Sequence, residues 1–204
     1  MAPVLTADDP RRPVLVRRGF VLEYVTLGWN VVGIVILAIS AIAARSVALA
    51  GFGLDSLIEI GASTVVVWEL SGAGEERQRR GLALIGYAFA ALGLYLLIQS
   101  SLVLASGYRP RHSPLGIAWT AATAIAMFIL SAGKARTGGQ LGNRVLRTEG
   151  RVTAIDGILA TAVLVGLILN AAAGWWWADP AAGYVLVYYA AREAREIFLS
   201  KENC

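Results

Sequence analysis

Residues 24–44 read YVTLGWNVVGIVILAISAIAA and contain no Asp, Glu, Lys or Arg. Three more uncharged windows follow at 81–108, 112–133 and 157–178. Each is at least about as long as the roughly 20 residues that a helix needs to cross the hydrocarbon core of a membrane. In lipid only helices and closed barrels satisfy their backbone polar groups, and the alternating segments of roughly ten residues typical of barrel strands are missing. The sequence therefore predicts an all-α integral membrane protein.

The composition of the whole chain agrees with this prediction. Of its 204 residues, 57% are hydrophobic and 16% are charged, whereas a soluble domain carries about 25% charged residues. The mean hydropathy of +0.62 excludes a soluble enzyme, a nucleic-acid-binding domain and a disordered protein, so the pI of about 9.5 does not indicate a nucleic-acid partner. Cys204 is the one cysteine and His112 the one histidine, which excludes an internal disulfide framework, a cysteine metal cluster and a histidine-rich metal buffer.

Six membrane spans account for the hydrophobic pattern. We expect helices at 19–43, 46–70, 81–106, 114–133, 148–172 and 176–198. The chain then consists of an N-terminal segment (1–18), a six-helix transmembrane domain (19–199) and a short tail (200–204), with no soluble domain. The longest connections, 70–81 and 134–147, are short, so we expect the activity within the membrane or at its surface.

The basic residues predict the orientation, because cytoplasmic loops of membrane proteins are rich in Lys and Arg. With the N-terminus inside, the three outer basic residues are Arg45, Arg109 and Arg111. The other fifteen of the 18 Lys and Arg residues lie inside, with Lys134 in the loop after the fourth span. Both termini are therefore expected in the cytoplasm, and we expect a multi-pass protein of the cell (plasma) membrane whose surroundings are the lipid bilayer.

Three acidic residues fall inside the predicted spans, where an ionised side chain costs about 2.5–3.5 kcal/mol on insertion scales. Asp55 and Glu59 are four residues apart and share one face of the second span, and Asp156 lies in the fifth. From the helical rise, Asp55 lies about 14 Å and Asp156 about 12 Å into their spans, near the middle of a core of about 30 Å. The three carboxylates are expected to bind a divalent metal cation there.

Three further residues are candidate ligands of the same metal site. Thr153 lies one turn before Asp156, and Glu149 lies on the same helix face nearer the cytoplasm, where it could receive the ion on its way in. Asn30 lies about 17 Å into the first span, at a suitable depth. Structural roles stay open for all of them, because polar side chains also form hydrogen bonds between helices and Glu149 is flanked by arginines.

Two other ionisable residues are expected to lie outside the metal site. Glu23 is close to the predicted cytoplasmic interface, beside Arg17 and Arg18, so an interfacial ion pair is expected. His112 lies in an outer turn and is expected to have no metal role.

The segment SVALAGFGLDSLIE, residues 46–59, resembles the second-helix signature of the cation diffusion facilitators. In that family a serine-led apolar run ends in D-S-L-x-D or H-S-L-x-D, and its two acids fall on Asp55 and Glu59. The fifth helix of the family carries an acid, a histidine three residues later and an Asp four residues after that. Here Glu149, Val152 and Asp156 occupy those positions, so the histidine is replaced by valine.

The resemblance implies a homodimeric exporter of divalent cations, often zinc, that takes up protons in exchange. It covers the membrane domain and indicates the small branch of the family that lacks the cytoplasmic C-terminal domain. Because imidazole suits zinc and oxygen-only sites suit manganese and magnesium, Val152 bears on the choice of metal. Zinc is expected first, on the family's behaviour, with manganese or iron(II) next; no other cofactor is expected.

The mechanism follows as a hypothesis from three carboxylates at one depth. The empty site cannot keep all three charged in a low dielectric, so protons and metal compete for them. Competition combined with alternating access, by rocking of helix groups, gives antiport. The hypothesis predicts a secondary transporter, not an enzyme, and equal transport by wild type and Asp55→Asn would contradict it.

Three alternatives from other functional classes stay open. The segment 51–55, GFGLD, resembles the G-x-G-D motif of intramembrane aspartyl proteases with one extra residue, and Asp156 could supply the second acid. A membrane metal sensor or scaffold that does not transport is the second alternative. A passive channel is the third, although channels favour several weak sites over one tight site. Cleavage of a peptide would identify a protease, and absence of ion uptake would identify a sensor or scaffold. Ion flux that does not depend on protons would identify a channel.

Overall fold

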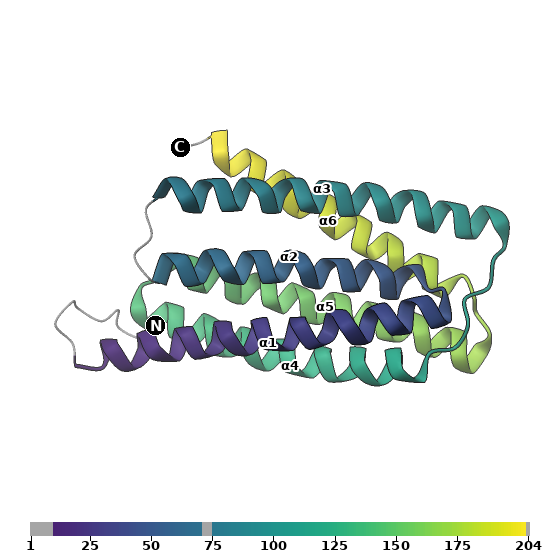
Figure 1. The fold of residues 1–204 in the computed structure, drawn as a ribbon, viewed down its shortest axis with the longest axis horizontal. Helices are drawn as coiled ribbons and strands as arrows, with labels where there is room; N and C mark the ends of the chain where they lie inside the picture. Colours follow the sequence, from purple (N-terminus) through teal and green to yellow (C-terminus); the bar gives the residue numbers. More distant parts are fainter. Residues whose placement is uncertain (1–9, 71–74, 203–204) are drawn as a thin grey trace.

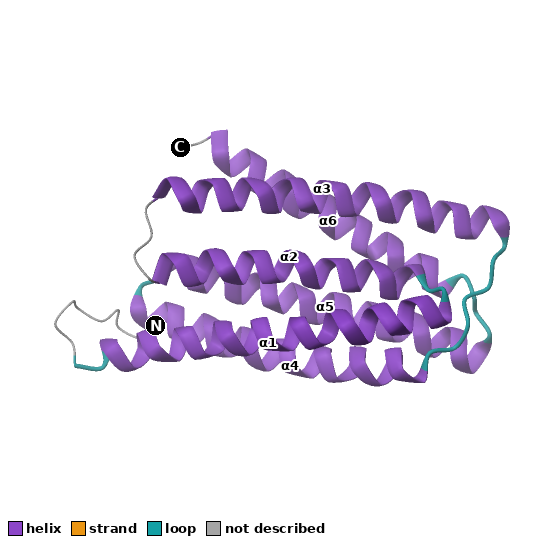
Figure 2. Ribbon diagram, in the orientation of Figure 1, coloured by secondary structure: helices purple, strands orange, loops and turns teal. Residues whose placement is uncertain are grey.

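The computed structural model describes residues 10–70 and 75–202, and within them it consists of six α-helices with no strand. Figure 2 shows that the described connections between these helices are short loops. The helices are α1 (Arg12–Ala44), α2 (Val47–Leu70), α3 (Glu75–Ser106), α4 (Pro114–Leu141), α5 (Arg144–Ala173) and α6 (Ala178–Glu202). The predicted all-α membrane fold with six helices is confirmed.

The helices run side by side along the long axis of the molecule (Figure 1). α4 packs along α5 and α1, α1 packs along α2, and α3 packs along α6. The pair α3 and α6 also contacts α2. α1 begins and α6 ends at the same end of the bundle, which we call the proximal end (Figure 1). Neighbouring helices α1, α2, α4 and α5 thus form one group, with α3 and α6 as a second pair beside it.

Membrane-spanning capacity is present in α1 to α5, each of which contains a helical stretch long and apolar enough to cross a bilayer by length and composition. α6 is not among these five helices. Its uncharged run, 180–191, is short, because Asp179 precedes it and Arg192 follows it. The orientation of the termini stays a prediction.

The expected loop at 134–147 is wrong. α4 continues to Leu141, and α5 begins at Arg144, so only Gly142 and Asn143 separate the two helices. Gly142 ends α4 with φ 65°, in the left-handed region that glycine adopts without strain. Asn143 caps α5, since its side chain accepts a hydrogen bond from Leu146 N at 2.8 Å. Because the turn comes only after Leu141, Lys134 lies within α4 and not in a loop.

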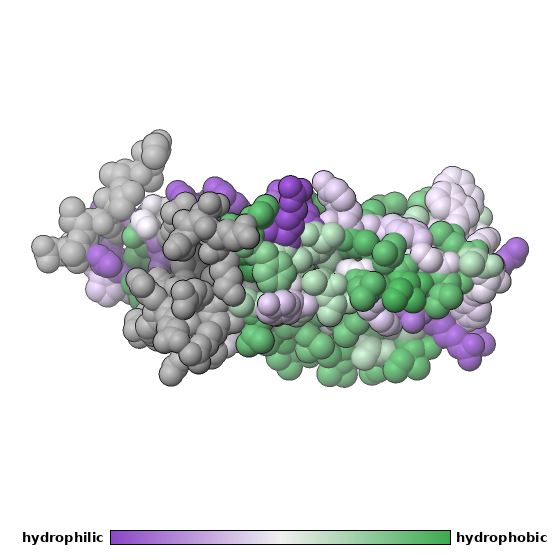
Figure 3. Space-filling model, turned by 90° about the horizontal axis from the view of Figure 1, so that it is seen from above, coloured by the Kyte–Doolittle hydropathy of each residue, from purple (hydrophilic) through white to green (hydrophobic). Residues whose placement is uncertain are grey.

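The packing is inverted relative to a soluble protein. Large apolar side chains of α1, such as Val25, Val32 and Ile39, are exposed, whereas Glu23 and Asn30 on the same helix are buried. On the face seen in Figure 3, hydrophobic residues gather over the half of the bundle farther from the proximal end. Exposed apolar area of this extent fits lipid contact, because no soluble monomer exposes it. The interior therefore holds polar side chains together with an apolar core.

Candidate functional site

The inner face of α1 is polar. Glu23, Thr26 and Asn30 recur at helical spacing on this face and are 0%, 0% and 2% exposed. Thr26 Oγ1 donates to Leu22 O at 3.0 Å, and Asn30 Nδ2 donates to Thr26 O at 3.1 Å. The Asn30 amide also interacts with the side chain of Glu59 on α2. The structure thus places Asn30 beside the expected metal site.

The two acids of α2 lie on one face, as their spacing predicts. Asp55 is 4% and Glu59 is 5% exposed, and Ser63 follows on the same face one turn nearer the proximal end. α2 runs toward the proximal end (Figure 1). Of these three residues, Asp55 is therefore the farthest from the proximal end and Ser63 the nearest to it.

α5 runs in the opposite direction and supplies Glu149, Thr153 and Asp156, all buried. Asp156 interacts electrostatically with both Asp55 and Glu59. Asp55, Glu59 and Asp156 also line the same cavity. The structure therefore brings together the three carboxyl groups that the sequence singled out.

A small cavity marks the place where these carboxyl groups meet. It has a volume of about 10 Å³, which is room for a single water-sized sphere. It is lined by residues of four helices: Asp55, Ile58, Glu59, Phe89, Val152, Asp156 and Tyr189. Val152, at the position where the resemblance has a histidine, is therefore part of the cavity wall.

Two carboxyl oxygens of this cluster have no hydrogen-bond partner within the described part of the chain. They are Asp156 Oδ1 and Glu59 Oε2, and both are buried. Buried acceptors without a donor are rare and costly in folded proteins. Among the described residues, however, no three His, Cys, Asp or Glu side chains converge into a ready metal cluster. A cation bound here would need the carboxylates to turn inward around it.

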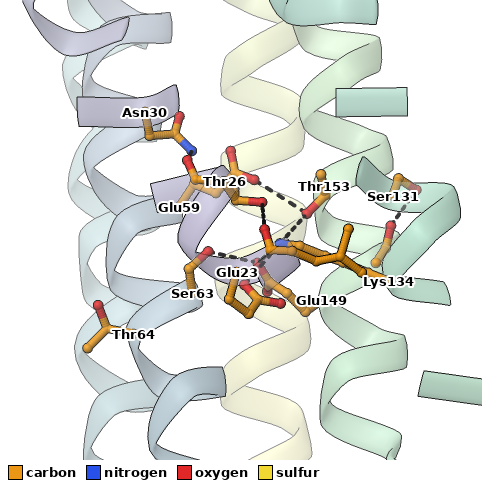
Figure 4. Close-up of polar contacts among 12 residues, drawn as sticks. Glu23, Thr26, Asn30, Glu59, Ser63, Thr64, Ser131, Lys134, Glu149 and Thr153 are labelled. Atoms are coloured by element: carbon orange, nitrogen blue, oxygen red, sulfur yellow. Dashed lines mark hydrogen bonds and ion pairs between the residues drawn. The ribbon is translucent and has the colours of Figure 1, made fainter. Parts of the chain in front are cut away.

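Sequence reasoning missed the most unusual side chain of the interior, Lys134 of α4. It is 0% exposed, although it was expected in a cytoplasmic loop. Its Nζ lies 3.1 Å from Glu23 Oε2 and 3.2 Å from Glu149 Oε1, and it donates to Thr153 Oγ1 at 3.1 Å (Figure 4). The signal that could have found it is the helical spacing of polar and small side chains along α4, all of them buried: Gly116, Thr120, Thr123, Ser131, Lys134 and Thr137.

The partners of Lys134 correct the expectation for Glu23 and add contacts to Glu149, whose role as an entry ligand stays a prediction. Glu23 pairs with Lys134 in the interior and not with Arg17 and Arg18, which are exposed. Glu149 is also held by Lys134 and accepts a hydrogen bond from Ser63 Oγ at 3.4 Å. The structural reason is the extended α4, which carries the ammonium to the depth of both carboxylates.

Thr153 links the ion pairs to the three-carboxylate cluster. Its Oγ1 accepts from Lys134 Nζ and donates to Glu59 Oε1 at 3.4 Å (Figure 4). Thr153 therefore lies between Lys134 and Glu59, as the close-up shows.

The α3 and α6 pair contributes two aromatic rings and one acid that the sequence did not single out. Phe89 and Tyr189 line the cavity, and their rings pack edge to face with centroids 5.8 Å apart. Glu193 follows Tyr189 by one turn toward the proximal end, is 8% exposed and interacts electrostatically with Asp55. The sequence signal that could have found them is the spacing of four residues between Tyr189 and Glu193, which places both on one face of a helix.

Comparison with known proteins gives one family match. The family model described as the cation efflux transmembrane domain matches residues 82–201, more than half of the chain. The matched range includes Glu149, Val152 and Asp156, whereas Asp55 and Glu59 on α2 precede it. No curated protein matches the chain.

Proposed function

Because the chain belongs to the cation efflux family and is therefore a cation transporter, we propose that it moves a divalent metal ion through the site of Asp55, Glu59 and Asp156. The observation that carries this proposal is that three buried carboxyl groups, from α2 and α5, line one cavity. Ionisable side chains inside a membrane are costly, and in transporters they mark ion pathways. The two unpartnered oxygens, on Asp156 and Glu59, are acceptors that a cation would satisfy.

The donors of the site bear on the metal. Carboxylates suit manganese, magnesium and iron(II), and zinc also accepts them. Val152 supplies no ligand atom to the cavity that it lines. We keep zinc first, on the family's behaviour, with manganese or iron(II) next, and treat Asn30 and Thr153 as further oxygen donors.

Coupling to protons follows from the charges in the interior. Seven carboxyl groups are buried among the described residues (Glu23, Asp55, Glu59, Glu149, Asp156, Asp179, Glu193), and Lys134 is the one buried basic side chain there. Desolvation prevents so many unbalanced charges from coexisting in a low dielectric. The carboxyl groups that the metal leaves are therefore expected to take up protons, and this exchange gives antiport when the site opens to each side in turn.

We place the protein in the plasma membrane, with both termini in the cytoplasm and export as the direction of metal transport. A homodimer is the expected assembly, on the behaviour of the family. The orientation rests on the distribution of basic residues, and the direction of transport and the homodimer rest on family membership.

The test is uptake of Zn²⁺ and Mn²⁺ into proteoliposomes under an imposed pH gradient. We expect gradient-driven uptake by the wild type and its loss in Asp55→Asn. Glu196→Gln is the matched control, because Glu196 is an exposed carboxylate of α6. Uptake by Asp55→Asn at the wild-type rate contradicts the proposed site. Folded wild-type protein that moves neither ion would instead favour a metal sensor or scaffold.

A further inference from the structure

Lys134 is a basic side chain that is completely buried in the bundle. It lies seven residues before the end of α4 at Leu141, about 10 Å from that end along the helix. Three acids from three other helices surround its ammonium: Glu23 of α1, Glu149 of α5 and, through electrostatic interaction, Glu59 of α2. The ammonium thus lies at the centre of the four-helix group.

The position of this ammonium along the bundle is between the proximal end and the three-carboxylate cluster. α4 reaches Lys134 just before it ends at the proximal end, and α5 starts there and reaches Glu149 before Asp156. On α2, Glu59 lies nearer the proximal end than Asp55. An ion that approaches from the proximal end along these helices meets the ion pairs of Lys134 before it meets Asp156 and Asp55.

The ion pairs of Lys134 are not arranged as a stable structural core would be. Removing an ammonium and two carboxylates from water is expensive, and the attraction between them repays this cost only when every polar atom is satisfied. Glu23 Oε1 is buried without a hydrogen-bond partner among the described residues, and so is Glu59 Oε2. A partly satisfied buried network is a costly arrangement, so stability alone does not account for it.

We propose that the Lys134 ammonium is a tethered cation that competes with the transported ion: it occupies the approach to Asp55, Glu59 and Asp156 and leaves Glu149 when the ion passes. This inference rests on the proposed function and adds a positioning residue to it. With the site empty of metal, the ammonium partly neutralises Glu149 and Glu59. When a divalent ion reaches Glu59, the two positive charges repel each other, and the ammonium shifts toward Glu23.

A competing internal cation has two measurable consequences. It weakens the binding of the metal, because the bound metal is repelled by the tethered positive charge nearby. It also speeds the release of the metal, because the ammonium returns to the carboxylates as the ion leaves. A lysine with a purely structural role would alter the folded yield or the melting temperature without changing either property.

The experiment compares Lys134→Met with Arg136→Met, an exposed basic residue of the same helix. Binding of Zn²⁺ and Mn²⁺ is measured by calorimetry on purified protein, and transport by the proteoliposome assay. We expect Lys134→Met to bind the ion at least tenfold more tightly, with a lower KM and a several-fold lower kcat. Arg136→Met is expected to match the wild type. Folded Lys134→Met with an unchanged or weaker affinity overturns the proposal.

A second comparison covers the case in which Lys134→Met does not fold. Glu149→Gln leaves the ammonium with one fewer counter-ion, and the double variant Lys134→Met/Glu149→Gln removes both members of the pair. If Lys134 competes with the metal, the double variant binds it at least tenfold more tightly than Glu149→Gln does. Equal affinities of these two variants overturn the proposal, because the lysine then has no effect on the bound ion.

Asp55→Asn separates this inference from the proposed function. If Asp55→Asn keeps wild-type affinity for both ions, the carboxylate site itself is wrong, and the role of Lys134 fails with it. If Asp55→Asn loses binding while the lysine variants behave as the wild type, the site stands and the tethered cation alone is refuted.

Discussion

At the scale of the residue, Thr153 is where the two charged clusters of the interior meet. Its hydroxyl accepts a hydrogen bond from Lys134 and donates one to Glu59. The side chain is 0% exposed, so no solvent can replace either bond. A single hydroxyl therefore keeps the ammonium and a carboxylate of the proposed metal site in one connected network.

Replacing this hydroxyl with a methyl group tests the connection. Thr153→Val keeps the shape of the side chain but leaves a donor on Lys134 and an acceptor on Glu59 unsatisfied, at a cost of about 1–3 kcal/mol in the free energy of unfolding. We expect a melting temperature clearly below that of Thr161→Val, since Thr161 is exposed on the same helix. Equal melting temperatures for the two variants would show that Thr153 does not connect the clusters.

Val152 is the residue at which the choice of metal can be tested. It lines the cavity together with Asp156, and a histidine there would bring an imidazole nitrogen to the carboxylates. Because imidazole suits zinc better than manganese, Val152→His should raise the preference for Zn²⁺ over Mn²⁺ by about tenfold. The ratio of the two dissociation constants measures this, with Val152→Ala as the control for altered volume. An unchanged ratio in Val152→His would place residue 152 outside the coordination shell.

At the scale of the element, the contact of α4 with α5 determines where Lys134 lies. A Cβ added at Gly150 would lie 2.8 Å from Ala135 N on α4, a separation that real Cβ atoms essentially never show. Ser131 Oγ donates to Gly150 O at 2.6 Å across the same contact. Small residues permit such close approach of membrane helices. The absence of a side chain at Gly150 thus lets α4 bring its lysine to Glu149.

Adding a methyl group at this contact should separate the two helices. Gly150→Ala is expected to lower the free energy of unfolding by about 1–3 kcal/mol, as over-packing in tight interiors does. Gly28→Ala is the matched control, since a Cβ at Gly28 of α1 meets nothing within 4 Å. Thermal melting of both variants decides, and a Gly150→Ala protein as stable as Gly28→Ala contradicts the prediction.

A second interhelical contact joins α6 to the start of α2 at the distal end of the bundle, which is the end opposite the proximal end. Asp179, in the first turn of α6, accepts hydrogen bonds from Ser46 Oγ and from the backbone N–H groups of Val47 and Ala48. These N–H groups begin α2 and have no partner within their own helix. One carboxylate therefore caps α2 and ties it to α6, which holds Asp55 and Tyr189 at opposite walls of the cavity.

At the scale of the whole molecule, the site lies between the two groups of helices. α2 and α5 supply the carboxylates, and Phe89 and Tyr189 of the α3 and α6 pair complete the lining of the cavity. A shift of that pair against the four-helix group would open or close the site without breaking either group. Alternating access by movement of one helix group against another requires such a boundary.

The orientation of the molecule can be tested with its single cysteine. We expect a membrane-impermeant maleimide to label Cys204 only after the membrane of intact cells is permeabilised, because the distribution of basic residues predicts that this end of the chain faces the cytoplasm. The control is Cys204→Ser combined with His112→Cys, since His112 is an exposed residue of the connection between α3 and α4. That variant should be labelled in intact cells. Reversed labelling of the two proteins would invert the orientation and, with it, the direction of transport.

Much of this molecule follows from local sequence. Uncharged runs of sufficient length predict the helices, because lipid leaves the backbone no other partners than its own. The spacing of Asp55 and Glu59 predicts a shared helix face, and their depth matches that of Asp156. Each of these inferences needs only helical geometry and the thickness of a membrane, which are the same for every chain.

The tertiary structure decided what depends on the distance between helices. Lys134 follows a long uncharged run and was therefore placed in a loop, yet α4 continues through it to Leu141. Glu23 then finds its counter-ion on a helix more than a hundred residues away in the chain. The spacing of polar residues along one helix shows which of its faces is buried, but it cannot show which other helix packs against that face. Contacts such as that at Gly150 select the neighbours and the depth at which they meet, and these contacts exist only when the bundle is packed.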